Sequence, residues 1–135
     1  GELSLLASDF LQPNGLTFTL DEKQLYITDT DRGHVRVFDV ADDGSISGGA
    51  VWAVPVGPGE GGCDGMKIDG KGNLFTTGPG GIHVYAPDAT SLGVIRVPEV
   101  AANFTWGDDD LKTMYITAST SLYHIGVNVP GRDIT

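Results

Sequence analysis

Basic residues are scarce in this chain. Its 135 residues include 8 Lys and Arg against 18 Asp and Glu, which gives a formal net charge of −10. A surface of this sign repels nucleic-acid phosphates and anionic lipid headgroups. We therefore expect neither a nucleic-acid partner nor a membrane-surface partner. The charge is compatible with a bound cation, although most of it is expected to be solvated surface.

Other features are also missing. A single cysteine, Cys63, excludes an internal disulfide and a multi-cysteine zinc site. No apolar run approaches the ~20 residues that span a bilayer, and no helical periodicity of useful length is present. The first residues show no basic region followed by an apolar run, so no signal peptide is expected. These absences favour a cytoplasmic protein.

What remains is the composition of an all-β domain. Gly occurs 20 times and Pro 7 times, as expected where many short strands are joined by tight turns. Apolar residues make up 40% of the chain, which is enough for a packed core. The length fits one domain.

A repeated pattern organises the strands. Pro13-Asn14-Gly15-Leu16 recurs as Cys63-Asp64-Gly65-Met66 and more weakly as Ala102-Asn103-Phe104. Each copy places a short oxygen-bearing side chain at the start of an apolar strand, and each is followed by a polar turn and a second strand. Units of four strands at spacings of about 40 to 50 residues are typical of β-propeller blades.

The expected division of residues 1–135 is half a propeller with an extra outer strand. That outer strand covers residues 3–7, and the blades cover residues 14–56, 64–97 and 103–129. The third blade lacks an evident fourth strand, since Pro130-Gly131 cuts short the candidate Val127–Val129. Three blades do not close a ring, because propellers carry ~4 to 8.

Several stretches, taken in order, resemble the gluconolactonase / senescence-marker-protein / luciferin-regenerating-enzyme family. They are Gln12–Leu16, Leu25–Thr30, Cys63–Leu74 and Asp110–Ala118. The resemblance implies a six-bladed propeller that binds one divalent cation, often calcium, and hydrolyses sugar lactones and related esters. It covers the C-terminal half of such an enzyme.

The resemblance also implies roles for two residues. Asn14 matches the family's asparagine metal ligand, and Asp64 matches the aspartate that binds the metal and acts as catalytic base. The family's glutamate ligand has no counterpart here. Amide and carboxylate oxygens are hard donors that favour Ca²⁺ or Mg²⁺, with Mn²⁺ and Zn²⁺ as further possibilities. Calcium takes ~6 to 8 oxygens, so other ligands must come from water, substrate or a second polypeptide.

Strand direction places the loop after each second strand at the same edge as Asn14 and Asp64. These loops form the expected rim of the site, and the candidate substrate-binding residues are Asp31, Arg32, Asn103, Ser119 and Thr120.

Plainer interpretations remain for several of these residues. Asn-Gly and Asp-Gly are ordinary turn dipeptides, and Asn103 fits a structural role. The three histidines lack metal-ligand spacing, Cys63 fits a small packed side chain, and Asp108–Asp110 fits a solvated hairpin turn.

Two assemblies can complete the ring. In a two-fold homodimer, residues 3–7 of each chain supply the missing outer strand of the partner's third blade. Alternatively, the chain is a piece of a longer enzyme and pairs with its missing N-terminal half. The function predicted is metal-dependent hydrolysis of a small-molecule lactone, against the alternatives of an inactive fragment or a non-catalytic scaffold that binds calcium or proteins.

Overall fold

The computed structural model describes residues 1–133, which form eleven β-strands and no helix. No helix able to cross a membrane is therefore present in the described part of the chain. The strands are β1 (Pro13–Phe18), β2 (Gln24–Asp29), β3 (His34–Val40), β4 (Ile46–Ala53), β5 (Met66–Ile68), β6 (Leu74–Gly78), β7 (Gly81–Tyr85), β8 (Ser91–Arg96), β9 (Ala101–Gly107), β10 (Thr113–Ala118) and β11 (Leu122–Gly126).

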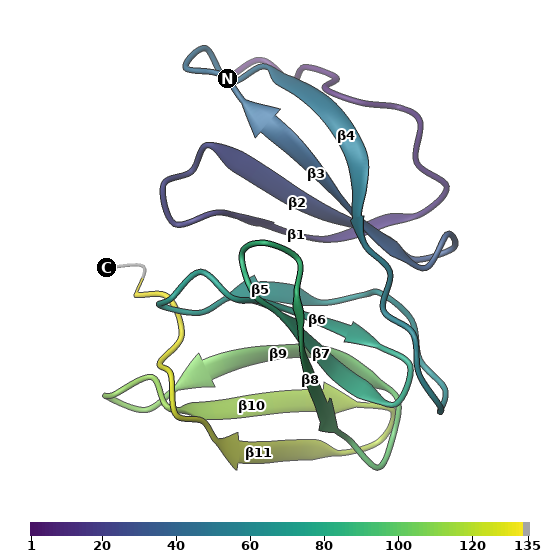
Figure 1. The fold of residues 1–135 in the computed structure, drawn as a ribbon, viewed down its shortest axis with the longest axis vertical. Helices are drawn as coiled ribbons and strands as arrows, with labels where there is room; N and C mark the ends of the chain where they lie inside the picture. The colour runs from purple at the N-terminus through teal and green to yellow at the C-terminus, as the bar shows by residue number, and fades with distance from the viewer. Residues whose placement is uncertain (134–135) are drawn as a thin grey trace.

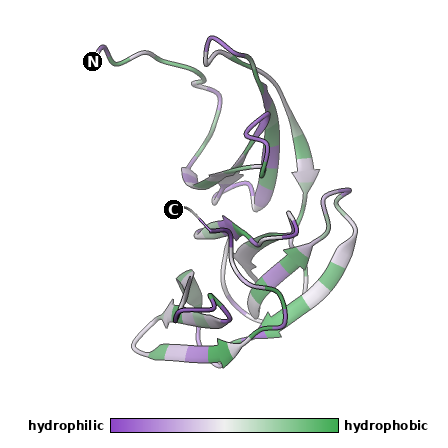
Figure 2. Ribbon diagram, turned by 90° about the vertical axis from the view of Figure 1, so that its left-hand side faces the viewer, coloured by the Kyte–Doolittle hydropathy of each residue, from purple (hydrophilic) through white to green (hydrophobic). Residues whose placement is uncertain are grey.

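These strands make three antiparallel sheets in chain order. The orders are β1-β2-β3-β4, β5-β6-β7-β8 and β9-β10-β11. Figure 1 shows the first sheet above the other two, and Figure 2 shows the sheets succeeding one another along a curve. The predictions of an all-β chain and of blade-like sheets are confirmed, including a third sheet that ends after three strands.

Strand pairing repeats from sheet to sheet. Leu16 pairs with Ile27, Met66 with Thr76 and Phe104 with Ile116. These three residues therefore occupy the same position on β1, β5 and β9, the first strands of their sheets. We call β1, β5 and β9 the inner strands, because β5 contacts both β1 and β9.

Two apolar layers join the three sheets. Tyr26 and Val35 of the first sheet pack against Met66 and Leu74 of the second. Phe75 and Ile82 of the second sheet pack against residues of the third, among them Phe104 and Met114. Met114, Val35 and Ile82 are completely buried. The core therefore lies between sheets, which fixes how the inner strands stand relative to one another.

The strand boundaries differ from the prediction at four places. Residues 3–7 form no strand, since the edge that an outer strand would pair with is not supplied by this chain, and Leu3 is fully exposed. The first sheet ends at Ala53 rather than at residue 56, because Pro55 has no N–H for a ladder. The third sheet begins at Ala101, and residues 127–129 form no strand.

The segment after β11 runs across the sheet ends instead. Val127 N–H donates to Lys112 O, Gly131 forms a bridge with Asp69, and Arg132 N–H donates to Ile68 O. The Arg132 guanidinium then reaches Glu22 of the first sheet at 2.8 Å. This C-terminal segment therefore ties all three sheets together at the edge opposite the starts of β1 and β5.

Candidate metal and substrate site

The starts of the three inner strands are in direct contact. A Cβ added to Gly15 would lie 2.1 Å from Asp64 O, and a Cβ added to Gly65 would lie 2.6 Å from Asn103 Oδ1. Neither position has room for a side chain. Glycine at these two sites therefore lets the backbone before β5 touch β1, and lets the start of β9 touch β5.

Buried threonine hydroxyls fix this junction. Gly15 N–H donates to Thr28 Oγ1 at 2.7 Å, and the Thr28 hydroxyl also lies 3.2 Å from Asp64 O. One sheet further on, Asp64 N–H donates to Thr77 Oγ1 at 2.8 Å. Thr28 and Thr77 have no exposed surface. The backbone that carries Asp64 is thus held from both neighbouring second strands.

Asn14 and Asp64 occupy equivalent positions, each just before the glycine of its strand. Asn14 Nδ2 donates to Thr30 Oγ1 at 3.3 Å, and Thr30 Oγ1 donates to Cys63 O at 2.6 Å. The chain Asn14–Thr30–Cys63 places the amide of Asn14 next to the residue that precedes Asp64. This bond occupies the amide nitrogen, and no hydrogen bond among the described residues occupies the Oδ1 oxygen, which could serve as a ligand to a cation.

This donor set suits a hard divalent cation but does not complete its shell. Asp64 is half-buried, and no hydrogen bond or ion pair among residues 1–133 occupies its carboxylate. Within the same residues, no three His, Cys, Asp or Glu side chains cluster as a full metal site. One amide and one carboxylate oxygen fit one side of a calcium shell, whose other ligands must come from outside this chain.

Asn103 does not belong to this pair. Its partner on β10 is Thr117, so it occupies the position of Gly15 and Gly65, one residue later than Asn14 and Asp64. A shift of one residue turns a strand side chain to the opposite face. Asn103 is exposed together with Thr105, and its Oδ1 accepts from Phe104 N–H at 2.9 Å. The structure places Asn103 beyond the strand starts, on the surface formed by the inner strands β1, β5 and β9, which we call the inner wall.

In the loop between β2 and β3, Arg32 is bound to other parts of the chain and Asp31 is exposed. Arg32 forms an ion pair with Asp29 at 3.1 Å and donates to Asp9 O at 2.6 Å. Its guanidinium therefore anchors the segment before β1, which limits its freedom to reach substrate. Asp31 is exposed at the tip of the same loop.

The rim loop of the third sheet is anchored by Glu99. The Thr120 N–H and hydroxyl both lie 2.9 Å from Glu99 Oε2, and the Tyr123 hydroxyl donates to Oε1 at 2.6 Å. Hydrogen bonds from Ser121, Tyr123 and Thr120 lower the pKa of Glu99 to about 2. Ser119 is exposed and lines a cavity of about 340 Å³ with Glu60 and Glu99. Thr120 thus holds the loop to Glu99, and Ser119 lines the cavity.

The structure also places the other residues that the sequence singled out. His83 is buried and its Nε2 lies 3.0 Å from Pro79 O, whereas His124 stacks on Tyr115 at the surface. Burial raises the pKa of the Cys63 thiol to about 11, so it is no nucleophile at neutral pH. Asp110 accepts from Lys112 N–H within the β9–β10 turn, and Asp108 accepts from the hydroxyl of Tyr115 on β10.

A model of the SMP-30/gluconolactonase/LRE-like region matches residues 1–120. The chain belongs to this family. Its members of known sequence include the gluconolactonase of Zymomonas mobilis, which is 31% identical over 134 residues that cover 93% of this chain and 37% of that protein. Pentonolactonase XacC of Haloferax volcanii is 32% identical over 112 residues, which cover 79% of this chain and 38% of that protein.

Solved structures of the family agree with the fold. A gluconolactonase of Xanthomonas campestris superposes with a TM-score of 0.78 at 30% identity, over 91% of this chain and 39% of that one. Regucalcin of Agrobacterium tumefaciens superposes with a TM-score of 0.84 at 21% identity, over 98% of this chain and 51% of that one. The chain thus spans between a third and about half of the family members it matches.

Sequence reasoning missed the threonines that hold the site. Thr28 and Thr77 each come near the end of the second strand of a unit, after Ile27 and Thr76. This shared position was a usable signal, but threonine is also common in strands for packing reasons. Only the contacts with Gly15 and Asp64 distinguish the two roles.

Proposed function

We propose that this chain supplies one side of the active site of a metal-dependent hydrolase acting on a sugar lactone or a related ester. The observation that carries the proposal is the contact between the Asn14-Gly15 and Asp64-Gly65 strand starts. It sets two hard oxygen donors at equivalent positions of adjacent inner strands. The gluconolactonases and the pentonolactonase among the relatives support lactones as the substrate class.

In this proposal Asn14 Oδ1 and the Asp64 carboxylate hold the cation, with Ca²⁺ as the first choice. A bound divalent cation supplies Lewis acidity to a lactone carbonyl. Asp64 also removes a proton from the attacking water as the water oxygen adds to the carbonyl carbon, and the ring C–O bond then breaks while that proton passes to the leaving ring oxygen, which becomes the product hydroxyl. The hydrogen bond from Asp64 N–H to Thr77 keeps this carboxylate in place during the proton transfer.

Substrate hydroxyls are held by the rim and the inner wall. Asp31 and Ser119 have exposed polar side chains suited to this role, and Asn103 lies further along the wall. Arg32 and Thr120 contribute through the loops that they hold, by way of Asp29 and Glu99. These assignments predict that substitutions of these residues change KM rather than kcat.

Turnover in this proposal requires a completed ring, because the cation needs ligands that this chain lacks. The partner is either a second copy of the chain or the missing N-terminal half of a longer protein. Both would cover the first and third sheets on their outer faces.

The test is hydrolysis of a panel of aldonolactones by the chain, alone and mixed with the N-terminal half of a family member, with and without calcium. We expect calcium-dependent turnover that falls by about 10² to 10⁴ in Asp64→Asn. Asp43→Asn changes the same charge in the exposed β3–β4 turn and should leave turnover unchanged. Calcium binding without turnover, or equal rates for Asp64→Asn and wild type, would favour the non-catalytic scaffold.

A further inference from the structure

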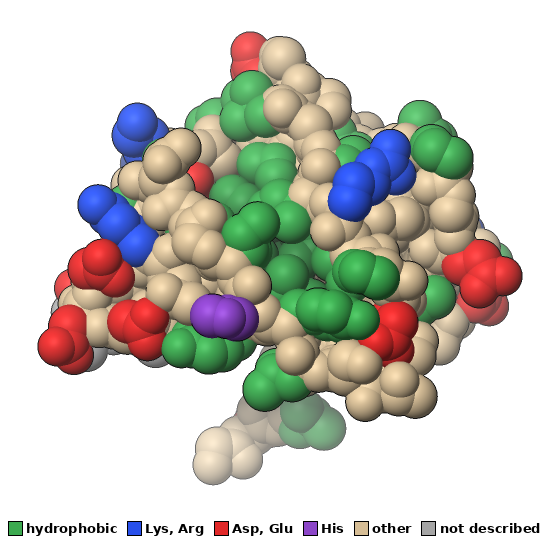
Figure 3. Space-filling view, turned by 90° about the horizontal axis from the view of Figure 1, so that it is seen from below, with side chains coloured by type: hydrophobic (Ala, Val, Ile, Leu, Met, Phe, Trp, Pro, Cys, Tyr) green, Lys and Arg blue, Asp and Glu red, His purple; other side chains and the backbone are tan. Residues whose placement is uncertain are grey.

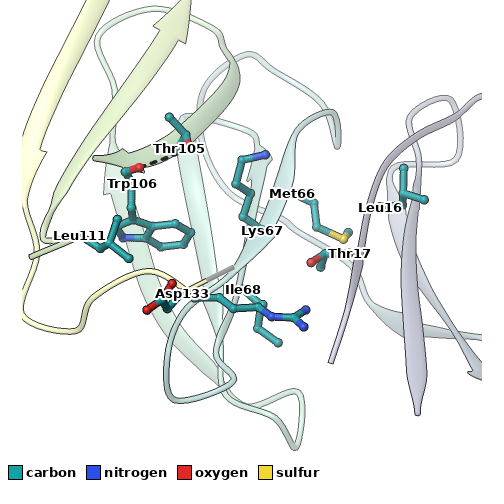
Figure 4. Close-up of a pocket in the computed structure, with 10 residues that line it drawn as sticks. Leu16, Thr17, Met66, Lys67, Ile68, Thr105, Trp106, Leu111 and Asp133 are labelled. Carbon is teal, nitrogen blue, oxygen red and sulfur yellow. Dashed lines mark hydrogen bonds between the residues drawn. The ribbon is translucent and has the colours of Figure 1, made fainter. Parts of the chain in front are cut away.

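A lysine stands on the inner wall without a partner. Lys67 is the middle residue of β5, between Met66 and Ile68, which are each 3% exposed. Strand alternation turns Lys67 to the face opposite these two core residues. In Figure 4 its side chain extends away from Met66 and Ile68, with the ammonium on the side of Thr105.

Lys67 lines two adjoining cavities along the inner strands. The first, of about 470 Å³, is shared with Thr17, Trp106 and Arg132 among others. The second, of about 360 Å³, is shared with Asn103, Thr105 and Thr117 among others. Asp133 also lines the first cavity but lies beside Leu111, away from the ammonium (Figure 4). Lys67 is therefore the cation common to both hollows of the inner wall.

Among the described residues, Lys67 differs from the other unpaired cations, Lys23, Lys71, Lys112 and Arg96, in being the one that lines the two cavities of the inner strands. Arg32, Arg36 and Arg132 are all used in ion pairs within the chain. Lys67 is the one lysine that lies within a strand of the described residues, and no ion pair or hydrogen bond there holds its ammonium. The unpaired ammonium of a half-buried lysine, in a cavity also lined by hydroxyl and amide side chains, is suited to an anionic ligand.

The distance along the chain between Asp64 and Lys67 bears on the length of that ligand. Asp64 lies just before β5 and Lys67 is the middle residue of β5, so an extended chain separates their Cα atoms by roughly 10 Å at ~3.3 Å per residue. A ligand that spans roughly this length along the inner strands would connect Asp64 with the cavities that Lys67 lines. The net charge of −10 repels anions elsewhere, so a local cation here selects for a charged far end.

We propose that Lys67 binds an anionic group, a carboxylate or a phosphate, at the end of the substrate remote from the lactone carbonyl. This inference rests on the proposed function for the identity of the substrate, but its binding step does not. The favoured substrates are lactones of aldaric acids or phosphorylated aldonolactones, in preference to neutral aldonolactones. Lys67 is a specificity residue and takes no part in the bond-breaking step.

The test is titration of the isotope-labelled chain, without divalent cations, with D-glucarate, 6-phosphogluconate and D-gluconate, followed by backbone amide shifts. We expect the amides of Lys67 and Thr105 to report binding of at least one of the first two probes about tenfold tighter than gluconate. Glucarate alone would identify the group as carboxylate, and 6-phosphogluconate alone as phosphate.

Variants decide whether Lys67 is responsible. Lys67→Met should lower the affinity for the tighter-binding probe to that for gluconate. Lys67→Arg should retain the preference for the anionic probe over gluconate. Lys112→Met removes an exposed lysine from the β9–β10 turn and should change nothing. Equal affinity for all three probes, or an unaltered preference in a folded Lys67→Met, would overturn the inference. Absence of lactone turnover would count against the proposed function and leave this binding result standing.

Discussion

At the scale of single residues, the candidate site depends on two glycines as much as on its ligands. Gly15 and Gly65 carry no functional group, yet each lies where a Cβ would overlap backbone or side-chain atoms of the next inner strand. The overlap at Gly15 is with the carbonyl oxygen of Asp64 itself. A methyl group there would push the Asp64 carboxylate away from Asn14.

Gly15→Ala tests this close approach. We expect the free energy of unfolding to fall by about 1–3 kcal/mol, because the added carbon overpacks a junction of two backbones. The measurement is the urea midpoint, with calcium affinity as a second readout that should also fall. Gly126→Ala is the matched control, since a Cβ at Gly126 meets nothing within 4 Å. A midpoint unchanged in Gly15→Ala would show that the junction can open without cost.

At the scale of elements, the segment before β1 is held over the first sheet by a small set of polar contacts. Leu11 and Gln12 N–H both donate to the Asp29 carboxylate at 3.0 Å. Asp9 pairs with Arg36 at 2.8 Å, and the Arg36 guanidinium lies over the adjoining rings of Phe10 and Phe38. This segment leads directly into Asn14, so its attachment fixes the approach to the ligand.

The pKa of Asp29 connects this attachment to pH. Burial raises it, but hydrogen bonds from the N–H groups of Leu11, Gln12 and Arg32 and the charge of Arg32 outweigh burial and lower it. A carboxyl whose pKa is lowered by folding stabilises the folded state above its unfolded pKa of about 3.9. That stabilisation is lost as the pH falls further, through the lower folded pKa.

Asp29→Asn should detach the segment. We expect about 1–3 kcal/mol of destabilisation, since the uncharged amide is a weaker acceptor for these donors, and faster hydrogen exchange at the Leu11 and Gln12 amides. The pH dependence of unfolding below about pH 4 should become shallower. Asp39→Asn, on exposed β3 surface, should leave exchange at Leu11 unaltered. Unchanged exchange in Asp29→Asn would mean that apolar contacts hold the segment.

At the scale of the whole molecule, both outer sheet faces are uncovered. Leu16 and Phe18 sit where Met66 and Ile68 sit in the second sheet, but they are 60% and 38% exposed because no earlier sheet packs on them. On the last sheet, Leu122 lies on the outer face beside its partner Thr117 and is 69% exposed. Figure 3, viewed from below Figure 1, shows apolar side chains gathered at the centre of this side of the molecule. Faces of this kind mark interaction surfaces.

A second copy covering these faces makes a measurable dimer. We expect light scattering to give twice the chain mass of 14.2 kDa at high protein concentration. Association should strengthen with salt, because two chains of net charge −10 repel each other until they are screened.

Surface variants locate the contact. Leu16→Lys and Leu122→Lys should each favour the monomer, since each buries a charge in an apolar contact. Leu92→Lys changes a leucine that is 57% exposed on the outer strand β8 and should leave the mass unchanged. A strict monomer under all conditions, or equal effects of all three variants, would rule out the two-fold ring and leave pairing with an N-terminal half.

The sequence by itself determined the strands, the blade-like units and the Asn14-Gly15 and Asp64-Gly65 motifs, because alternation and turn residues act over a few neighbours in the chain. It aligned Asn103 with Asn14 because both are asparagines, but the pairing of Asn103 with Thr117 places it one residue further along its unit, at the position of Gly15. Tertiary structure alone revealed the contact of Gly15 with Asp64, the buried hydroxyls of Thr28 and Thr77, and the unpaired Lys67. These depend on how separate sheets pack, and that is set by shape and burial between residues far apart in the chain.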